Sequence, residues 1–154
     1  MKNFKLNEKD ILSNQDWTFP TTTYYGPGRF NEIAKFCEEF DIKNPLIVTD
    51  SGSKDLPFIK KLIALLSKNN IKSDLFYNIS PNPRDDEISK GCDQFKNGSH
   101  DSIIAIGGGS AMDGGKSICL TVNSETPLWD FEFEQPVPKI TKENAFPKII
   151  TVPT

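Results

Sequence analysis

Residues 102–117 read SIIAIGGGSAMDGGKS, an apolar run that is followed by three glycines and a mixed polar and apolar segment. Continuous apolar runs are typical of strands covered on both faces of a parallel sheet, which predicts a strand over Ser102–Ile106. Gly107–Gly109 break this strand, and a helix is predicted from Ser110 to about Val122. The stretch therefore predicts a strand, a tight turn and a helix in direct succession.

The same alternation of strands and helices extends in both directions along the chain. Strands joined by helices imply right-handed crossovers and parallel pairing. The predicted fold class is therefore α/β, a Rossmann-like parallel sheet with helices on both faces. The further predicted strands are 18–25, 46–50, 73–80 and 148–152, and the further predicted helices are 29–40, 56–69 and 85–97.

The domain organisation follows from this pattern. Residues 1–18 are interpreted as an N-terminal extension, and residues 19–154 as one α/β domain. Residues 123–146 contain several prolines and no clear period, so they are expected to form an irregular excursion. The run KIITV at 148–152 is expected to be another buried strand, and Asp85 is expected to cap the helix that follows it.

Composition and charge exclude several classes of protein. The 154 residues include 18 basic and 21 acidic side chains, with a formal net charge of −3, which argues against an electrostatic grip on nucleic acid or on an anionic membrane. The most hydrophobic stretch, Phe58–Leu66, contains two lysines and is too short to span a bilayer. Charged residues interrupt the N-terminus, which therefore lacks the apolar core of a secretory signal. A cytoplasmic protein is expected.

The cysteines and the single histidine indicate no metal site. Cys37, Cys92 and Cys119 are widely spaced and odd in number, so buried free thiols are expected rather than a disulfide framework. His100 precedes a predicted strand, at the end of the sheet where ligands do not bind, and is expected to be a solvated loop residue. One histidine without a cysteine pair forms no zinc or iron site.

The glycine turn predicts a phosphate site. Gly107–Gly109 carry no Cβ, so their backbone permits a positive φ and the close approach of a ligand. The free N–H groups and the dipole of the following helix favour an anion there. The alternative is a tight turn that needs glycine for packing alone, and three glycines with Ser110 fit that alternative less well.

Two standard phosphate motifs do not match this turn. The dinucleotide pattern GxGxxG fails because Met112 occupies the place of its third glycine. The Walker pattern GxxxxGK[ST] nearly fits at Gly115–Ser117, but Ser110 stands where its first glycine belongs, and Asp113 adds a negative charge. A phosphate-loop hydrolase is therefore disfavoured.

Other polar residues at strand ends have two interpretations each. Asp50 follows LIVTD, where its carboxylate either accepts hydrogen bonds from the ribose of NAD and repels the 2′-phosphate of NADP, or caps the next turn. Asn82 lies in Pro81-Asn82-Pro83 and either offers its amide to a ligand or belongs to a plain rigid turn. Asp113 and Lys116 either lie near a cofactor or form an intrahelical ion pair.

The order of LIVTD, PNP, IIAIGGGSAMDGGKS and KIITVPT resembles the N-terminal half of the iron-containing alcohol dehydrogenases. That family belongs to a superfamily shared with glycerol dehydrogenases and dehydroquinate synthase. The resemblance covers roughly Phe19–Thr154, and GGGSxxDxxK after IAI is its most specific motif. YYGPGRF near the start also resembles the early strand, turn and first helix of the family.

The resemblance implies an alcohol dehydrogenase that depends on NAD and on a metal, with a small alcohol or aldehyde as its substrate. By the same resemblance, Asp50 contacts the adenosine ribose, Asn82 lies beside the cofactor, and Thr154 is the first of two threonines at the nicotinamide side. The remaining matches are the pyrophosphate turn Gly107, Gly108, Gly109 and Ser110, and the Asp and Lys of the motif, Asp113 and Lys116.

In the family, an all-helical domain supplies the aspartate and histidines that hold a divalent metal, commonly iron or zinc. Those positions lie outside this sequence, so the chain is expected to be the cofactor-binding half of such an enzyme, without catalysis of its own. The alternative is a stand-alone nucleotide-binding module without catalysis. A homodimer is left open as the assembly.

Overall fold

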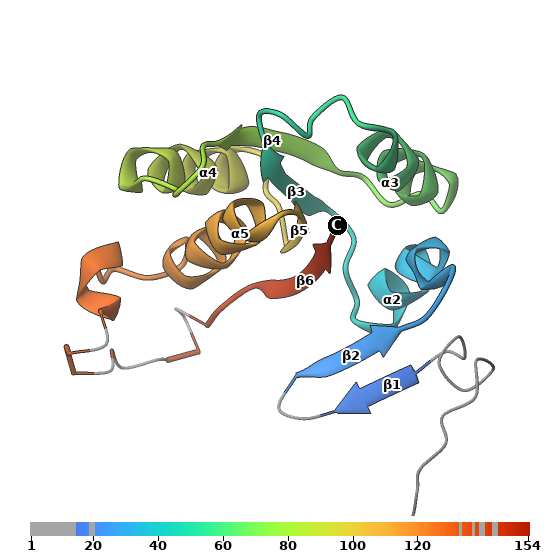
Figure 1. Cartoon of the computed structure of the whole chain (residues 1–154). Coiled ribbons are helices and arrows are strands. Elements are labelled where there is room, and N and C mark those ends of the chain that lie inside the picture. The colour runs from blue at the N-terminus through green and yellow to red at the C-terminus, as the bar shows by residue number, and fades with distance from the viewer. Residues whose placement is uncertain (1–14, 19–20, 133, 137, 139–140, 143–144) are drawn as a thin grey trace, which may run out of the picture.

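The computed structural model describes residues 15–18, 21–132, 134–136, 138, 141–142 and 145–154. In this part of the chain, a parallel sheet of four strands has the order β4–β3–β5–β6 (Figure 1). The strands are β3 (Pro45–Asp50), β4 (Asp74–Ile79), β5 (Ser102–Gly107) and β6 (Lys148–Pro153). The helices are α2 (Ile33–Glu39), α3 (Pro57–Lys68), α4 (Asp85–Asn97) and α5 (Gly109–Thr121), with short 3-10 turns η1 (Arg29–Glu32) and η2 (Leu128–Phe131).

Helices cover both faces of this sheet, as the alternation of elements predicts. Along β3 the side chains of Leu46 and Val48 face α4 and α5, whereas Ile47 faces α2 and α3. The central strand β5 alternates in the same way, and its apolar side chains are fully buried. Strands buried on both faces must be apolar throughout, which explains the uninterrupted runs in the sequence. The Rossmann-like α/β fold is confirmed.

The predicted helices begin and end close to their expected residues. On α3, Ile59, Leu62 and Leu66 are buried, which is the 3.6-residue period of an amphipathic helix. Asn70 follows this helix with φ 58°, a left-handed conformation that asparagine tolerates at a helix end. The cap of α4 differs from expectation, because Arg84 rather than Asp85 is its N-cap residue.

The N-terminal region forms a strand pair rather than the single strand predicted at 18–25. Strand β1 (Gln15–Thr18) pairs antiparallel with β2 (Thr22–Tyr25) in a separate two-stranded sheet. Strand β1 lies within the segment interpreted as an N-terminal extension. The division of the chain at residue 18 stays a prediction.

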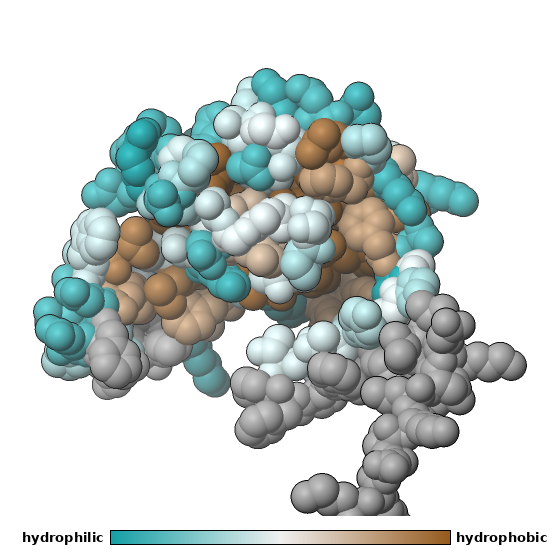
Figure 2. Space-filling view, viewed as in Figure 1, coloured by the Kyte–Doolittle hydropathy of each residue, from teal (hydrophilic) through white to brown (hydrophobic). Residues whose placement is uncertain are grey.

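The expectation that 148–152 is a buried strand is wrong in this chain. Strand β6 forms with the predicted residues, but it lies at the edge of the sheet, and its side chains alternate between exposed and half-buried. A groove of about 660 Å³ separates it from β2 and α2, and Ile149, Ile150 and Val152 contribute to its lining. Figure 2 shows apolar surface on the body of the molecule where it borders this hollow. An edge strand is covered by neighbours on one side only, so an apolar run does not guarantee burial.

The end of the sheet at which the parallel strands begin is closed by polar contacts. The expectation that His100 is a solvated loop residue is wrong. Its side chain is 0% exposed, and its Nε2 lies 3.3 Å from a carboxylate oxygen of Asp74. Its Nδ1 lies 3.0 Å from the carbonyl of Asn44, and the Asp101 carboxylate accepts the N–H groups of Lys43 and Asn44. His100 lies far from Asn44 and Asp74 in the sequence and meets them only in the folded chain, which local polarity does not indicate.

Two further observations concern the whole described part of the chain. No helix in it has the length and apolar character needed to cross a membrane.

Cys37 and Cys119 are buried free thiols, as expected, and Cys92 is half-buried. Burial raises the pKa of Cys37 to about 11, with the negative charge of Asp101 adding to the effect, and burial raises the pKa of Cys119 to about 11. Neither thiol is activated as a nucleophile.

Candidate functional site

The carboxyl ends of the parallel strands lie together at one end of the sheet, which we call its carboxyl edge, and the predicted site residues gather there. Asp50 of β3 is in register with Ile79 of β4, and Gly107 of β5 with Pro153 of β6. The strand ends therefore lie side by side, with the N-terminus of α5 directly after β5. Ligands of open α/β sheets bind at such an edge.

Gly107 begins the turn in a conformation that only glycine adopts readily. Its φ is 139°, and a Cβ at this position would lie 2.9 Å from the Cβ of Ala111 and 3.3 Å from a carboxylate oxygen of Asp50. The turn thus passes close to both the helix and the end of β3. Glycine at 107 is required by the fold itself.

Gly108 and Gly109 differ from Gly107, because a Cβ at either position would have no atom within 4 Å. Gly108 is the N-cap residue of α5, and Gly109 is the first residue of this thirteen-residue helix. The unpaired N–H groups of a helix's first turn and its dipole attract anions. No side chain crowds the backbone at these two positions, and an anion such as a phosphate can approach a helix N-terminus that is open in this way.

Asp50 lies beside this turn and also caps the loop that follows β3. One of its carboxylate oxygens accepts the N–H of Ser53 at 2.9 Å, and the other accepts the hydroxyl of Ser53 at 2.8 Å. The capping interpretation is therefore correct. It does not exclude the ribose contact, because each carboxylate oxygen retains a second lone pair, and Asp50 is only half-buried.

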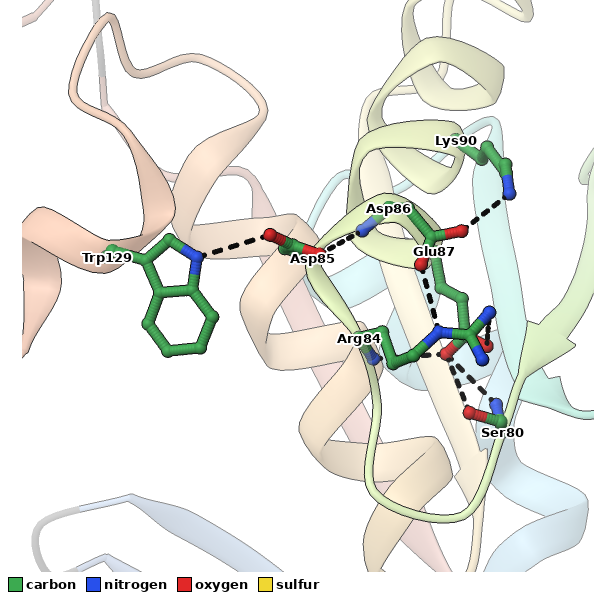
Figure 3. Close-up of polar contacts among 7 residues, drawn as sticks. All are labelled: Ser80, Arg84, Asp85, Asp86, Glu87, Lys90 and Trp129. Carbon is green, nitrogen blue, oxygen red and sulfur yellow. Dashed lines mark hydrogen bonds and ion pairs between the residues drawn. The ribbon is translucent and has the colours of Figure 1, made fainter.

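Asn82 lies in the turn after β4 with φ 56°, a left-handed conformation that asparagine tolerates better than most residues. Asn82 is exposed to solvent. The turn is tied down on both sides of Asn82 by Glu87 of α4, whose carboxylate accepts hydrogen bonds from Ser80 and Arg84 (Figure 3). Burial raises the pKa of Glu87, but the hydrogen bonds from Arg84 and Ser80 outweigh it and hold this pKa below its ordinary value.

Thr154 also reaches the glycine turn, because its N–H donates to the carbonyl of Gly107 at 3.2 Å. Ser110 lies in the first turn of α5 and is half-buried. Asp113 and Lys116 are exposed on the same helix, with the ammonium 3.5 Å from a carboxylate oxygen. The intrahelical ion pair expected as their alternative is therefore present.

Gly114 and Gly115, which stand just before Lys116, belong to the core. A Cβ on Gly115 would lie 2.4 Å from the Cβ of Ala105 in β5, and one on Gly114 would lie 2.7 Å from the side chain of Ile79 in β4. Both residues are inside α5, so Lys116 stands on a helix and not in a loop around a triphosphate. The structure agrees with the rejection of a Walker motif.

Sequence reasoning missed Ser53 and Glu87 as parts of this edge. Ser53 follows Asp50 by three residues, the spacing of a side chain that caps its own turn. Glu87 is the third residue of α4 and accepts the N–H of its N-cap residue Arg84 at 3.1 Å, one half of a capping box. The order of these residues in the sequence carries both signals.

The residues that the structure describes contain no group of three or more His, Cys, Asp or Glu side chains that could hold a metal ion. The donors needed for a metal centre are therefore not assembled in this part of the chain. The polar groups at the carboxyl edge are amides, hydroxyls and single carboxylates. They suit phosphate and ribose.

Comparison with known proteins agrees with this arrangement. The family model of iron-containing alcohol dehydrogenases matches residues 20–154. Alcohol dehydrogenase 4 of Schizosaccharomyces pombe is 34% identical over 113 residues, which is 73% of this chain and 27% of that protein. NADH-dependent butanol dehydrogenase A of Clostridium acetobutylicum is 31% identical over 138 residues, 89% of this chain and 35% of that protein. The chain thus spans about a third of the length of the curated relatives it matches.

The fold is shared with solved structures of similar proteins. A crystal structure of 1,3-propanediol oxidoreductase superposes with a TM-score of 0.75 at 28% identity, covering 84% of this chain and 32% of that one. An alcohol dehydrogenase from Oenococcus oeni gives a TM-score of 0.75 at 26% identity, covering 84% of this chain and 33% of that one. The chain belongs to the iron-containing alcohol dehydrogenase family.

Proposed function

We propose that this chain binds NAD as the cofactor-binding part of an alcohol dehydrogenase, which transfers hydride between a small alcohol or aldehyde and the nicotinamide. The observation that carries the proposal is the open N-terminus of α5, where Gly108 and Gly109 leave no atom within 4 Å of a would-be Cβ. A relative named NADH-dependent butanol dehydrogenase A supports the choice of cofactor. NAD supplies the hydride acceptor, and the protein supplies its position.

Each proposed contact uses a group at the carboxyl edge of the sheet. The N–H groups of Gly108, Gly109 and Ser110 bind the pyrophosphate, because they lie at the N-terminus of α5, the positive end of the helix dipole. Asp50 accepts hydrogen bonds from the adenosine ribose, in the orientation that Ser53 imposes. This carboxylate would meet the extra phosphate of NADP with like charge, which favours NAD.

Four further residues complete the proposed site. The amide of Asn82 contacts the cofactor from the turn after β4. Thr154 lies at the nicotinamide side, fixed by its N–H bond to Gly107. Lys116 contributes positive charge from the second turn of α5, and Asp113 holds its side chain. None of these residues is proposed to be catalytic.

A divalent metal, iron or zinc, is part of the proposed enzyme, but the residues that the structure describes do not form a site for it. Those residues include no cluster of metal-binding side chains. No catalytic step is therefore assigned to this chain. We expect it to bind NAD and not to reduce an aldehyde with NADH on its own.

Calorimetric titration of the chain with NAD, ADP-ribose and NADP tests the proposal. NAD and ADP-ribose are expected to bind with similar affinity, because the proposed contacts are mainly to the phosphates and the ribose. NADP is expected to bind at least about tenfold more weakly, since a like charge beside Asp50 costs more than 1.4 kcal/mol. Failure of both NAD and ADP-ribose to bind would refute the proposed function.

A further inference from the structure

Glu87 is the one buried carboxylate among the described residues, and the proposed contacts with NAD do not use it. Its residue is 6% exposed, in the first turn of α4. Burying an ionised carboxylate costs free energy unless hydrogen bonds replace the lost water. The role of this buried carboxylate is therefore to be sought in the groups that it binds.

The carboxylate of Glu87 holds both ends of the turn between β4 and α4. One of its oxygens accepts the N–H of Ser80 at 3.2 Å, the hydroxyl of Ser80 at 3.0 Å and the N–H of Arg84 at 3.1 Å. The other oxygen lies 3.3 Å from the guanidinium of Arg84. Figure 3 shows Ser80 and Arg84 converging on this one side chain. The two ends of the turn are thus joined through a single group.

The turn that is held in this way carries Asn82 at its centre. Pro81 and Pro83 flank Asn82 and have no N–H, so neither can anchor the turn by donating a backbone hydrogen bond. The φ of 56° at Asn82 is a conformation that most residues avoid and that the surroundings must maintain. The contacts at Ser80 and Arg84 supply that restraint.

We propose that Glu87 is a positioning residue for the cofactor site, which acts through the 80–84 turn to present the amide of Asn82 to NAD. The inference rests on the proposed function. Glu87 does not touch the cofactor itself. Its removal therefore weakens NAD binding only as far as Asn82 contributes to that binding.

The test compares Glu87→Gln with Asp86→Asn in the full 154-residue chain. Glutamine keeps the shape but has one acceptor oxygen and no charge, so it cannot replace all the contacts. We expect NAD affinity to fall about fivefold, the effect of one lost hydrogen bond, and the N–H groups of Ser80 and Arg84 to exchange faster with solvent. Asp86 is the matched control, because it is an exposed neighbour that also pairs with Arg84 but does not contact Ser80. Asp86→Asn should change neither measurement.

A double-mutant cycle separates positioning from a general loss of stability. Asn82→Gly keeps the left-handed φ accessible while it removes the amide. If Glu87 acts through Asn82, the double variant binds NAD as weakly as Asn82→Gly alone. Losses that add in full would overturn the inference. Ser80→Ala, which removes one donor and leaves the carboxylate in place, should show a smaller loss in the same direction.

The outcomes also distinguish this inference from the proposed function. Wild-type binding of NAD together with unchanged affinity in Glu87→Gln would overturn the positioning role alone. Unchanged exchange of the Ser80 and Arg84 N–H groups in Glu87→Gln would overturn it as well. Absence of NAD binding by the wild-type chain would overturn the proposed function and, with it, the role of Glu87.

Discussion

The two glycine pairs of α5 and its N-terminus have opposite surroundings, although they stand only a few residues apart. Gly108 and Gly109 face open space, whereas Gly114 and Gly115 lie against the side chains of Ile79 and Ala105. In the sequence, both pairs are simply glycines within GGGSAMDGGKS. The comparison shows that one pair lets a ligand approach the backbone, while the other lets a helix approach the sheet.

The largest expected effect comes from a side chain on the packed pair. Gly115→Val places a branched side chain where even a Cβ would overlap that of Ala105, so the helix must move off β5. We expect the free energy of unfolding to fall by about 3 kcal/mol, a severe loss for an overpacked core. Urea denaturation followed by circular dichroism measures it.

A compensating pair of substitutions checks this assignment. Gly115→Ala should destabilise the fold less than valine does, and Ala105→Gly should restore part of the loss by removing the opposing Cβ. Destabilisation that Ala105→Gly fails to reduce would mean that another contact causes it.

The matching substitution in the open pair should spare the fold and remove the ligand. Gly108 has φ −72° and ψ −177°, which any residue adopts, so valine is accommodated. Its branched side chain blocks the approach of a phosphate, and we expect NAD affinity to fall at least about tenfold, the worth of one hydrogen bond to a charged group. Titration with NAD and urea denaturation are made on the same sample. Retained affinity would contradict the assignment of the turn.

A third prediction concerns the carboxylate beside the open pair. Asp50→Gly removes the proposed ribose acceptor and the charge that opposes NADP, so NAD should bind more weakly and the preference for NAD over NADP should fall about tenfold. Part of any loss of stability comes from the bonds to Ser53, and Ser53→Ala serves as the control for that part. Identical titration curves for both cofactors before and after the substitution would remove Asp50 from the site.

The smallest effect is expected from the exposed pair on α5. Lys116→Gln removes an ion pair of 3.5 Å between side chains that are more than half exposed, so stability should change by less than about 0.5 kcal/mol. NAD affinity should fall by less than about threefold at low salt and remain unchanged at high salt, because exposed charges are screened. A loss that persists at high salt would indicate a direct contact with the cofactor.

The interior of the fold was predictable, and its boundaries with solvent were less so. The runs at β3 and β5 are apolar because both faces are covered, and their burial follows directly from that pattern. The run at β6 looks the same in sequence, yet it lies at the sheet edge and is partly exposed. An apolar run reports what a strand tolerates, whereas its place in the strand order decides what covers it.

The polar residues follow the same division. The open glycine turn and the position of Asp50 at a strand end were predictable from local sequence. The burial of His100 was not, because its neighbours Asn44 and Asp74 are distant in the chain and meet it only in the folded structure. The sequence predicts the N-cap of α4 one residue late, because Asp85 is by residue type a better cap than Arg84, which occupies that position.

Local order alone thus determined which segments become strands and helices, where the backbone turns without side chains, and which family the chain resembles. These properties depend on residues within a few positions of one another. The tertiary structure decided which glycines are open to a ligand, which residues surround His100 and which strand is left at the edge. Those properties depend on distances between segments, and side-chain type does not encode such distances until the sheet brings the segments together.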